Sequence, residues 1–219
     1  MGWLWHRRLG HDGMKQLNKL IKHDLVRGLK DVTFEKDKLC SACQAKKQVG
    51  NTHPKKSMMS TYKAFELMHM DLFGPTTYTS IGGNKYGFMI VDDLTRYTWV
   101  LFLVDKSDVF ATFKTFIKRI HNEFETTIMK VRSDNGSEFK NTRVDNLCDE
   151  FGIRHQFLAK YTPQSNGLVE RKNRTLIDMA RSMLSEYNVS HSFWAEAINT
   201  ACYYSNLPIL SSFVGEDTI

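Results

Sequence analysis

The sequence predicts an α/β protein in which a mixed sheet is flanked by helices. The middle of the chain contains β-branched and aromatic runs of strand length, which is the first observation behind this fold class. The second is a set of apolar stripes at helical spacing between and after those runs. The expected order is three strands, a helix, a strand, a helix, a strand and then helices.

The N-terminal part of the chain is basic and shows little strand pattern. Leu17, Leu20, Ile21 and Leu25 recur at helical spacing, which predicts a short helix. The polar stretch 49–61 contains a proline and indicates a linker. We therefore expect a small helical module over residues 1–53, a linker over 54–62, a core over 63–210 and a divergent tail over 211–219.

Three strands open the predicted core. The apolar run 65–71 ends at Asp71, and the runs 86–91 and 97–104 flank residues 92–96, a pattern that predicts a hairpin. Carboxylates are expected for solubility in such a turn, so Asp92 and Asp93 are not predicted as metal ligands.

Helices and strands then alternate. Ser107 is predicted to cap a helix with an apolar face that extends to Phe124. A strand over 128–134 precedes a helix that Gly152 should stop, and a short strand follows over 153–157. A long helix carries Glu170, and a final helix begins near Phe193, with Pro208 beyond its end.

Composition narrows the class of function. Thirty Lys and Arg residues against 24 Asp and Glu give a net charge of +6 and a pI near 9.1, which mildly favours a polyanionic partner. No apolar run approaches the roughly 20 residues of a membrane span. Four cysteines in a chain of this length do not suggest a disulfide framework. We expect an intracellular protein that does not associate with membranes.

Three carboxylates are the candidate catalytic residues. Asp71 and Asp134 each follow an extended apolar run, and Glu170 opens the long helix after 35 intervening residues. If they converge, their oxygens suit a pair of Mg²⁺ or Mn²⁺ ions, which clamp the attacking and leaving oxygens of a phosphodiester. The alternatives are ordinary: a turn or cap role for Asp134, a Glu170–Arg174 ion pair, and a strand-end surface position for Asp71.

Two histidines and two cysteines form a second constellation. His6, His11, Cys40 and Cys43 supply the four N and S ligands that a structural Zn²⁺ requires. Histidines five residues apart do not share one ideal helix face, so Gly10 is expected to break the helix and turn both rings inward. The alternative is that the histidines are surface residues and the cysteines incidental.

These features resemble a known family. The three carboxylates have the D,D-35-E pattern of retroviral and retrotransposon integrases. The segments Arg132-Ser133-Asp134-Asn135-Gly136 and Pro163-Gln164-Ser165-Asn166-Gly167-Leu168-Val169-Glu170-Arg171-Lys172-Asn173-Arg174 look like the Copia-type (Ty1/copia) branch. The resemblance covers roughly residues 3–208, and it departs at Ser137 and Ser165, where the family usually has Gly and often Gln.

The resemblance implies a ribonuclease H-like fold and a metal-dependent polynucleotidyl transferase. Asp71 and Asp134 would share a first Mg²⁺ or Mn²⁺ ion, and Asp71 with Glu170 would hold a second. The implied activity is 3′-end processing and strand transfer of element DNA into host DNA, by a homo-oligomer that works in the nucleus after import from the cytoplasm. It also implies an HHCC module with a structural Zn²⁺.

The DNA-binding surface is expected around Glu170. Cationic side chains contact phosphates, and amides reach base edges or sugars; the candidates are Lys160, Tyr161, Gln164, Asn166, Arg171, Lys172 and Arg174. The alternative is a solvated helix face. His155, Glu138 and Asp145 are expected to have packing or surface roles.

Two other functions remain open from the sequence. One is a nuclease of the same fold that only cuts. The other is a non-catalytic nucleic-acid-binding remnant or co-opted copy, because residues 210–219 depart from the continuation usual in the family.

Overall fold

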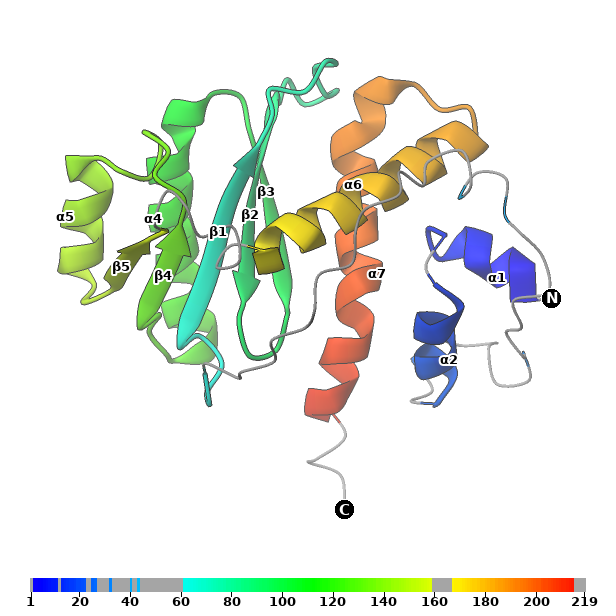
Figure 1. Cartoon of the computed structure of the whole chain (residues 1–219), viewed down its shortest axis with the longest axis horizontal. Coiled ribbons are helices and arrows are strands. Elements are labelled where there is room, and N and C mark those ends of the chain that lie inside the picture. Colours follow the sequence, from blue (N-terminus) through cyan, green and yellow to red (C-terminus); the bar gives the residue numbers. More distant parts are fainter. Residues whose placement is uncertain are drawn as a thin grey trace. The chain divides into compact units, whose positions relative to one another are not determined.

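The computed structural model describes residues 2–11, 13–22, 25–26, 32, 40, 43, 61–158 and 167–214 (Figure 1). Of residues 210–214 it describes only the backbone. The chain divides into two compact units, one of residues 57–174 and one of residues 1–56 with 175–219. The long helix that carries Glu170 contributes to both.

A five-stranded mixed sheet forms the first unit. Its strands, in the order β3-β2-β1-β4-β5, are β3 Thr98–Leu103, β2 Tyr86–Asp92, β1 Leu67–Phe73, β4 Lys130–Ser133 and β5 Arg154–Phe157. Strand β1 pairs antiparallel with β2 and parallel with β4, and β4 pairs parallel with β5. The predicted fold class and order of elements are therefore confirmed.

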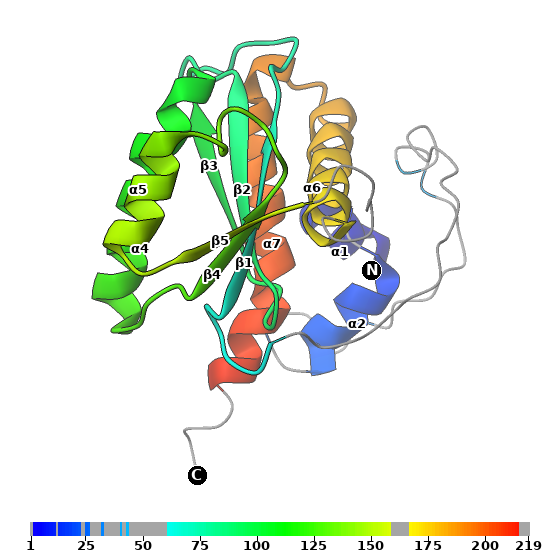
Figure 2. The ribbon, with the colours of Figure 1, turned by 60° about the vertical axis from the view of Figure 1, so that its left-hand side comes forward.

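One face of the sheet packs on two helices, α4 Val109–Phe124 and α5 Thr142–Glu150 (Figure 2). Side chains alternate between the faces of a strand, so Met68 and Met70 of β1 point to this side together with Phe88 and Ile90 of β2. They form a single apolar core with the apolar stripes of the two helices. The remaining side chains of β1, among them His69 and Asp71, belong to the opposite face.

Helix ends follow local chemistry, with one correction. The predicted cap Ser107 does not cap α4. Asp105 instead accepts hydrogen bonds from the backbone N and the hydroxyl of Ser107, at 2.9 and 2.8 Å, and caps a short 3₁₀ turn (Lys106–Asp108) that leads into α4. A carboxylate accepts two donors at once, so it is the better cap. Gly152 ends α5 as predicted, with φ of +66°.

The second unit is helical. It contains α1 Gly2–Arg8, α2 Met14–Lys22, the later part of α6 Gly167–Glu186, a 3₁₀ turn at His191–Phe193, and α7 Trp194–Val214. Its core consists of buried residues near the N-terminus packed against α7: Leu9, Leu17, Leu20, Val32, Tyr204 and Leu207. The predicted short helix is confirmed as α2, although Leu25 lies beyond its end.

Pro208 lies inside α7, so the prediction that it follows the helix is wrong. A proline removes one backbone donor and bends a helix, but its fixed φ of about −65° is compatible with helical backbone, and α7 continues to Val214. Across the described segments, no helix combines the length and apolarity needed to cross a bilayer.

Candidate active site and zinc centre

Asp71 lies inside strand β1, as its fifth residue of seven. The strand begins at Leu67 rather than at Phe65 and continues to Phe73, so Asp71 does not end the strand. Its Cα pairs with Met89 of β2, and its side chain belongs to the face opposite the helices α4 and α5. Asp71 is therefore held by the sheet on the face that those helices leave uncovered.

Asp134 follows β4, the other neighbour of β1. His69 pairs with Arg132 in the parallel ladder, and continuing this register by two residues sets Asp134 opposite Asp71. Neighbouring strands lie about 4.7–4.9 Å apart, and the charge of Asp134 acts on the carboxyl of Asp71. Asp134 is exposed, and its Oδ1 accepts a hydrogen bond of 3.0 Å from the backbone N of Gly136.

The electrostatics of Asp71 reflect this arrangement. Burial raises the pKa of its carboxyl above the ordinary value, and the charges of Asp134 and Glu138 raise this pKa further. A hydrogen bond from Asn173 opposes the shift. A partly buried carboxylate with acidic neighbours is a position that a cation would stabilise.

Helix α6 reaches this face through Asn173. The Nδ2 of Asn173 donates a 3.0 Å hydrogen bond to Oδ2 of Asp71, across 102 positions of sequence. Asn173 is 8% exposed and lies three residues after Glu170, so the two share one side of the helix. Glu170 itself is exposed, in the first turn of α6.

Strand register thus sets Asp134 beside Asp71. The first turn of α6, which carries Glu170, is tied to Asp71 by the hydrogen bond from Asn173. Among the described residues, these three carboxylates do not form a group as tight as the His/Cys set below. The alternative Glu170–Arg174 ion pair is not found there either. Sequence reasoning did not assign a role to Asn173, although its spacing of three from Glu170 was a usable signal.

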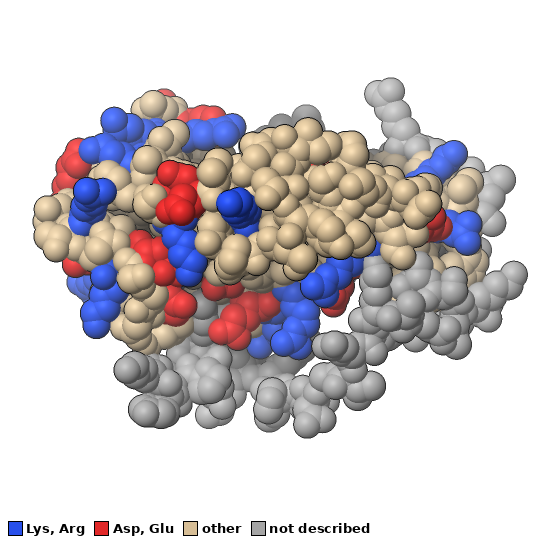
Figure 3. Space-filling model, turned by 90° about the horizontal axis from the view of Figure 1, so that it is seen from above, with Lys and Arg blue, Asp and Glu red and all other residues tan. Residues whose placement is uncertain are grey.

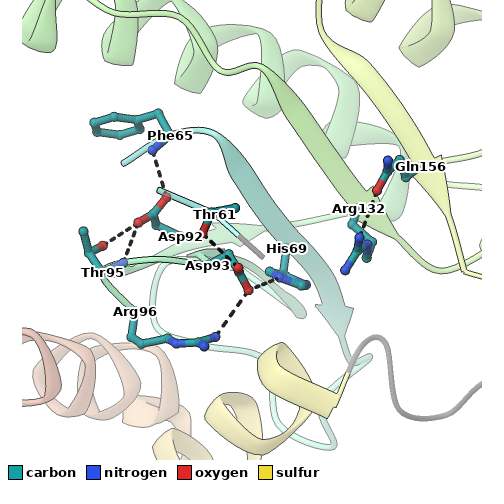
Figure 4. A network of polar contacts seen from close by, with 9 residues as sticks. All are labelled: Thr61, Phe65, His69, Asp92, Asp93, Thr95, Arg96, Arg132 and Gln156. Atoms are coloured by element: carbon teal, nitrogen blue, oxygen red, sulfur yellow. Dashed lines mark hydrogen bonds and ion pairs between the residues drawn. The ribbon is translucent and has the colours of Figure 1, made fainter. Parts of the chain in front are cut away.

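A buried polar network supports β1 two residues before Asp71 (Figure 4). Asp93 accepts hydrogen bonds from Thr61, at 3.0 Å, and meets the Nε2 of His69 at 2.9 Å. Arg96 approaches the same carboxylate at 3.5 Å. Thr61, His69 and Asp93 are all buried, at 2%, 2% and 8% exposed.

Asp92 has a separate set of partners. Its carboxylate accepts the backbone N of Phe65 at 2.9 Å, and both the backbone N and the hydroxyl of Thr95 at 2.8 and 2.7 Å. The expectation that the turn carboxylates serve solubility is wrong, because Asp92 and Asp93 are buried and satisfied by donors. Hydrogen bonds to an ionised carboxylate are stronger than those between neutral groups, so they offset the cost of burying these side chains.

The strand after Asp134 is also anchored by polar contacts. The hydroxyl of Ser133 lies 2.9 Å from Nε2 of His155 on β5, and the side chain of Asn135 donates to the carbonyl of Leu158. His155 is half-buried and packs against Phe157 with ring centroids 4.1 Å apart and the ring planes tilted by 38°. The residues on either side of Asp134 are thus joined to His155 of β5 and to Leu158 just after that strand.

The second unit holds a compact His/Cys group. The ligand atoms of His6, His11, Cys40 and Cys43 all lie within 4.8 Å of one another. Cys40 Sγ is 3.4 Å from Nδ1 of His11, and Cys43 Sγ is 3.4 Å from Nε2 of His6 and 3.6 Å from Nδ1 of His11. Both histidines are buried.

Gly10 makes this arrangement possible, as predicted. Helix α1 ends at Arg8, Gly10 has φ of +68° and His11 has φ of +60°. The backbone N of His11 then bonds to the carbonyl of His6 at 2.8 Å, which brings the two rings to a centroid separation of 4.9 Å. A Cβ at Gly10 would also lie 3.2 Å from the sulfur of Met183.

The group fits a tetrahedral zinc ion. Bonds of about 2.3 Å to S and about 2.0–2.1 Å to N place neighbouring S and N ligands about 3.6 Å apart. The observed S–N distances of 3.4–3.6 Å match this value. Four protein ligands leave no open coordination position, which is typical of a structural site.

The predicted DNA-binding residues fall into two groups. Lys160, Tyr161, Gln164 and Asn166 lie outside the described residues. Arg171 and Arg174 are exposed on α6 and Lys172 is half-exposed, all within one turn of Glu170. Acidic and basic side chains are mixed on the face shown in Figure 3, so charge alone does not delimit an interface there.

We predict that His69 makes the protein less stable at mildly acidic pH. Burial lowers the pKa of His69 in the folded state, so its stabilising contribution is complete above the unfolded pKa of about 6.5 and is lost as pH falls toward the folded pKa. The unfolding free energy should fall from pH 7 to pH 5, and less steeply in His69→Gln. Exposed His121→Gln should follow the native slope; equal slopes for His69→Gln and native protein would refute the assignment.

We also predict that Asp71→Asn stabilises the protein in buffer without Mg²⁺ or Mn²⁺. The folded-state pKa of Asp71 is raised, so its contribution to stability is present at low pH and is lost as pH rises through that pKa. Asn removes this cost at pH 7, and the Tm should rise by about 2–4 °C per kcal/mol recovered. Exposed Asp145→Asn is the control, and a lower Tm for Asp71→Asn contradicts the prediction.

Two family models match the chain in succession. The GAG-pre-integrase domain matches residues 1–48, and the integrase core domain matches residues 61–163. The first match contains the four His/Cys ligands, and the second contains Asp71 and Asp134.

Relatives and a solved structure agree with these matches. The chain is 37% identical to the retrovirus-related Pol polyprotein from transposon TNT 1-94 of Nicotiana tabacum, over 93% of this chain and 15% of the relative. It is 34% identical to that from transposon RE2 of Arabidopsis thaliana, over 92% of this chain and 14% of the relative. The chain thus spans about 15% of the length of these relatives.

The fold is similar to a chain in the simian T-cell lymphotropic virus intasome, solved in complex with a PP2A regulatory subunit. The TM-score is 0.56 at 19% identity, covering 76% of this chain and 57% of that one. At this identity the likeness concerns the fold, which is that of an integrase core. The matches to both domains and to the plant transposon polyproteins show that the chain belongs to the Copia-type retrotransposon integrases.

Proposed function

We propose that this chain is a metal-dependent polynucleotidyl transferase that processes the 3′ ends of element DNA and transfers them into host DNA. The observation that carries the proposal is the hydrogen bond from Asn173 to Asp71. It joins the turn that holds Glu170 to the strand that holds Asp71, opposite Asp134. In this proposal the carboxylates of Asp71 in β1, Asp134 after β4 and Glu170 in α6 converge on one region of the sheet.

Each of these residues has a part in the proposed mechanism. Asp71, Asp134 and Glu170 would hold two Mg²⁺ or Mn²⁺ ions, with Asp71 shared between them. Such ions, when bound, activate a water or a DNA 3′-hydroxyl and stabilise the leaving oxygen. Asn173 donates a hydrogen bond to Oδ2 of Asp71 and would so orient the carboxylate for metal binding. No covalent enzyme intermediate is required.

The zinc-binding group has a structural role in this proposal. His6, His11, Cys40 and Cys43 would hold one Zn²⁺ and stabilise the N-terminal helices. In terms of sequence, we propose that residues 1–53 are the zinc module, 54–62 a linker, 63–210 the catalytic core and 211–219 a tail. Residues of the core from 175 onward lie in the same compact unit as the module.

DNA is the proposed partner, bound as element ends and as target. Arg171, Lys172 and Arg174 would contact phosphates beside Glu170, together with Lys160, Tyr161, Gln164 and Asn166 from the segment before α6. We further propose a homo-oligomer, because joining two element ends to one target uses two catalytic sites. The activity requires access to the nucleus.

We predict that Glu170→Gln abolishes cleavage and strand transfer. The test is a strand-transfer assay with Mn²⁺ and oligonucleotides of the element ends. Loss of a metal-binding carboxylate removes catalysis, while DNA affinity stays the same or rises because a negative charge near phosphates is lost. Exposed Glu196→Gln on α7 is the matched control and should retain activity.

Other outcomes separate the alternatives. Cleavage without strand transfer would support a nuclease. Tight DNA binding without any metal-dependent activity would support a non-catalytic remnant. A protein that neither binds nor cuts DNA would overturn the proposal.

We predict that Lys172→Ala and Arg174→Ala weaken DNA binding for all sequences. When a phosphate contact is lost, DNA binding releases fewer counterions. The slope of log affinity against log salt should therefore become shallower by about one unit per contact. Binding is measured by fluorescence anisotropy over a salt series. Lys118→Ala is the control, because Lys118 is exposed on α4, which covers the opposite face of the sheet. An unchanged slope in the α6 variants would place the DNA elsewhere.

A further inference from the structure

The ring of His11 has a different partner at each of its two nitrogens. Its Nδ1 faces the sulfur atoms of Cys40 and Cys43, at 3.4 and 3.6 Å. Its Nε2 contacts Oε2 of Glu186, the last residue of α6. His11 and Glu186 are 175 positions apart, so this contact depends entirely on the packing of the helical unit.

Glu186 is held in place from its other side. Its Oε1 lies 2.9 Å from Nε of Arg7 on α1, so each carboxylate oxygen has one cationic or N–H partner. The side chain of His11 is 1% exposed and that of Glu186 is 16% exposed, whereas that of Arg7 is 60% exposed. The His11–Glu186 contact is therefore shielded from solvent, unlike an ordinary surface ion pair.

The contact selects one form of the imidazole. A neutral imidazole carries its proton on one nitrogen and a lone pair on the other. With Nε2–H donating to Glu186, the lone pair lies on Nδ1 and points toward the two sulfur atoms. A metal-binding histidine commonly donates its other N–H to a carboxylate, which fixes the ring and makes it a stronger ligand.

We propose that Glu186 is a positioning residue of the zinc centre: it accepts a hydrogen bond from Nε2–H of His11 and so presents Nδ1 to the metal. The inference rests on the proposed zinc centre and adds a fifth residue to it, from a helix outside the predicted module. Arg7 in turn orients Glu186. Zinc binding and the packing of the last turn of α6 then stabilise each other.

The test is zinc affinity, measured on the whole chain by competition with a chromogenic chelator. Native protein should bind one Zn²⁺, and Cys40→Ser should lose it. Glu186→Gln should bind zinc about 10-fold more weakly, since the amide keeps a hydrogen-bond acceptor but loses the charge. Glu186→Leu, which removes the acceptor, should approach a 100-fold loss, the upper end for such partners. Glu196→Gln is the control with the same charge change and should match native affinity.

A second measurement separates positioning from general packing. The gain in Tm on adding zinc should shrink in Glu186→Gln, while the Tm without zinc stays near that of the control. If Glu186→Gln and Glu196→Gln bind zinc equally, the inference is overturned and the zinc centre stands. If the native protein binds no zinc, the zinc centre itself is overturned, and the inference with it.

Discussion

The double pairing of strand β1 is the constraint on which the sheet unit depends. Its ladders to β2 and β4 leave it no freedom of register, and side chains alternate strictly between the faces. Met68 and Met70 consequently enter the apolar core, while His69 and Asp71 face the other side. A slip of one residue would bury the carboxylate among α4 and α5 and expose two methionines. The core thus determines where the candidate site lies.

Polar groups on that face offset the cost of placing charge there. Asp93 receives donors from Thr61 and His69 on that face, whereas Asp92, whose Cα pairs with Met68, lies on the core side and receives donors from Phe65 and Thr95. Both carboxylates tie the hairpin to the start of β1. Asp71 accepts hydrogen bonds from the side chain of Asn173 and from the backbone of Leu72, but burial and its acidic neighbours still raise its pKa. The contrast separates structural carboxylates, which are satisfied by the protein, from one that a cation can still stabilise.

The helical unit shows how a small metal module depends on the rest of the chain. Leu9, Leu17 and Leu20 are too few to form a core of their own, and they are buried against Tyr204 and Leu207 of α7. Few apolar residues give little stabilisation, so structural metals are common in such small units. Helix α6 carries Glu170 in its first turn and Glu186 at its last residue, so the candidate catalytic carboxylate and the carboxylate beside His11 belong to one helix.

Local signals in the sequence determined the order of the elements, the hairpin after β2, the end of α5 at Gly152 and the turn at Gly10. They also singled out the four residues of the His/Cys group, whose compact arrangement the structure shows. These features depend on periodicity, on ligand chemistry and on the backbone preferences of a few neighbouring residues, all of which are present in the sequence itself. Only the tertiary structure decided that Asp92 and Asp93 are buried, that Asn173 meets Asp71 and that Glu186 meets His11. Each of those contacts joins residues far apart in the chain, and their positions follow from how the sheet and helices pack, for which no local pattern exists.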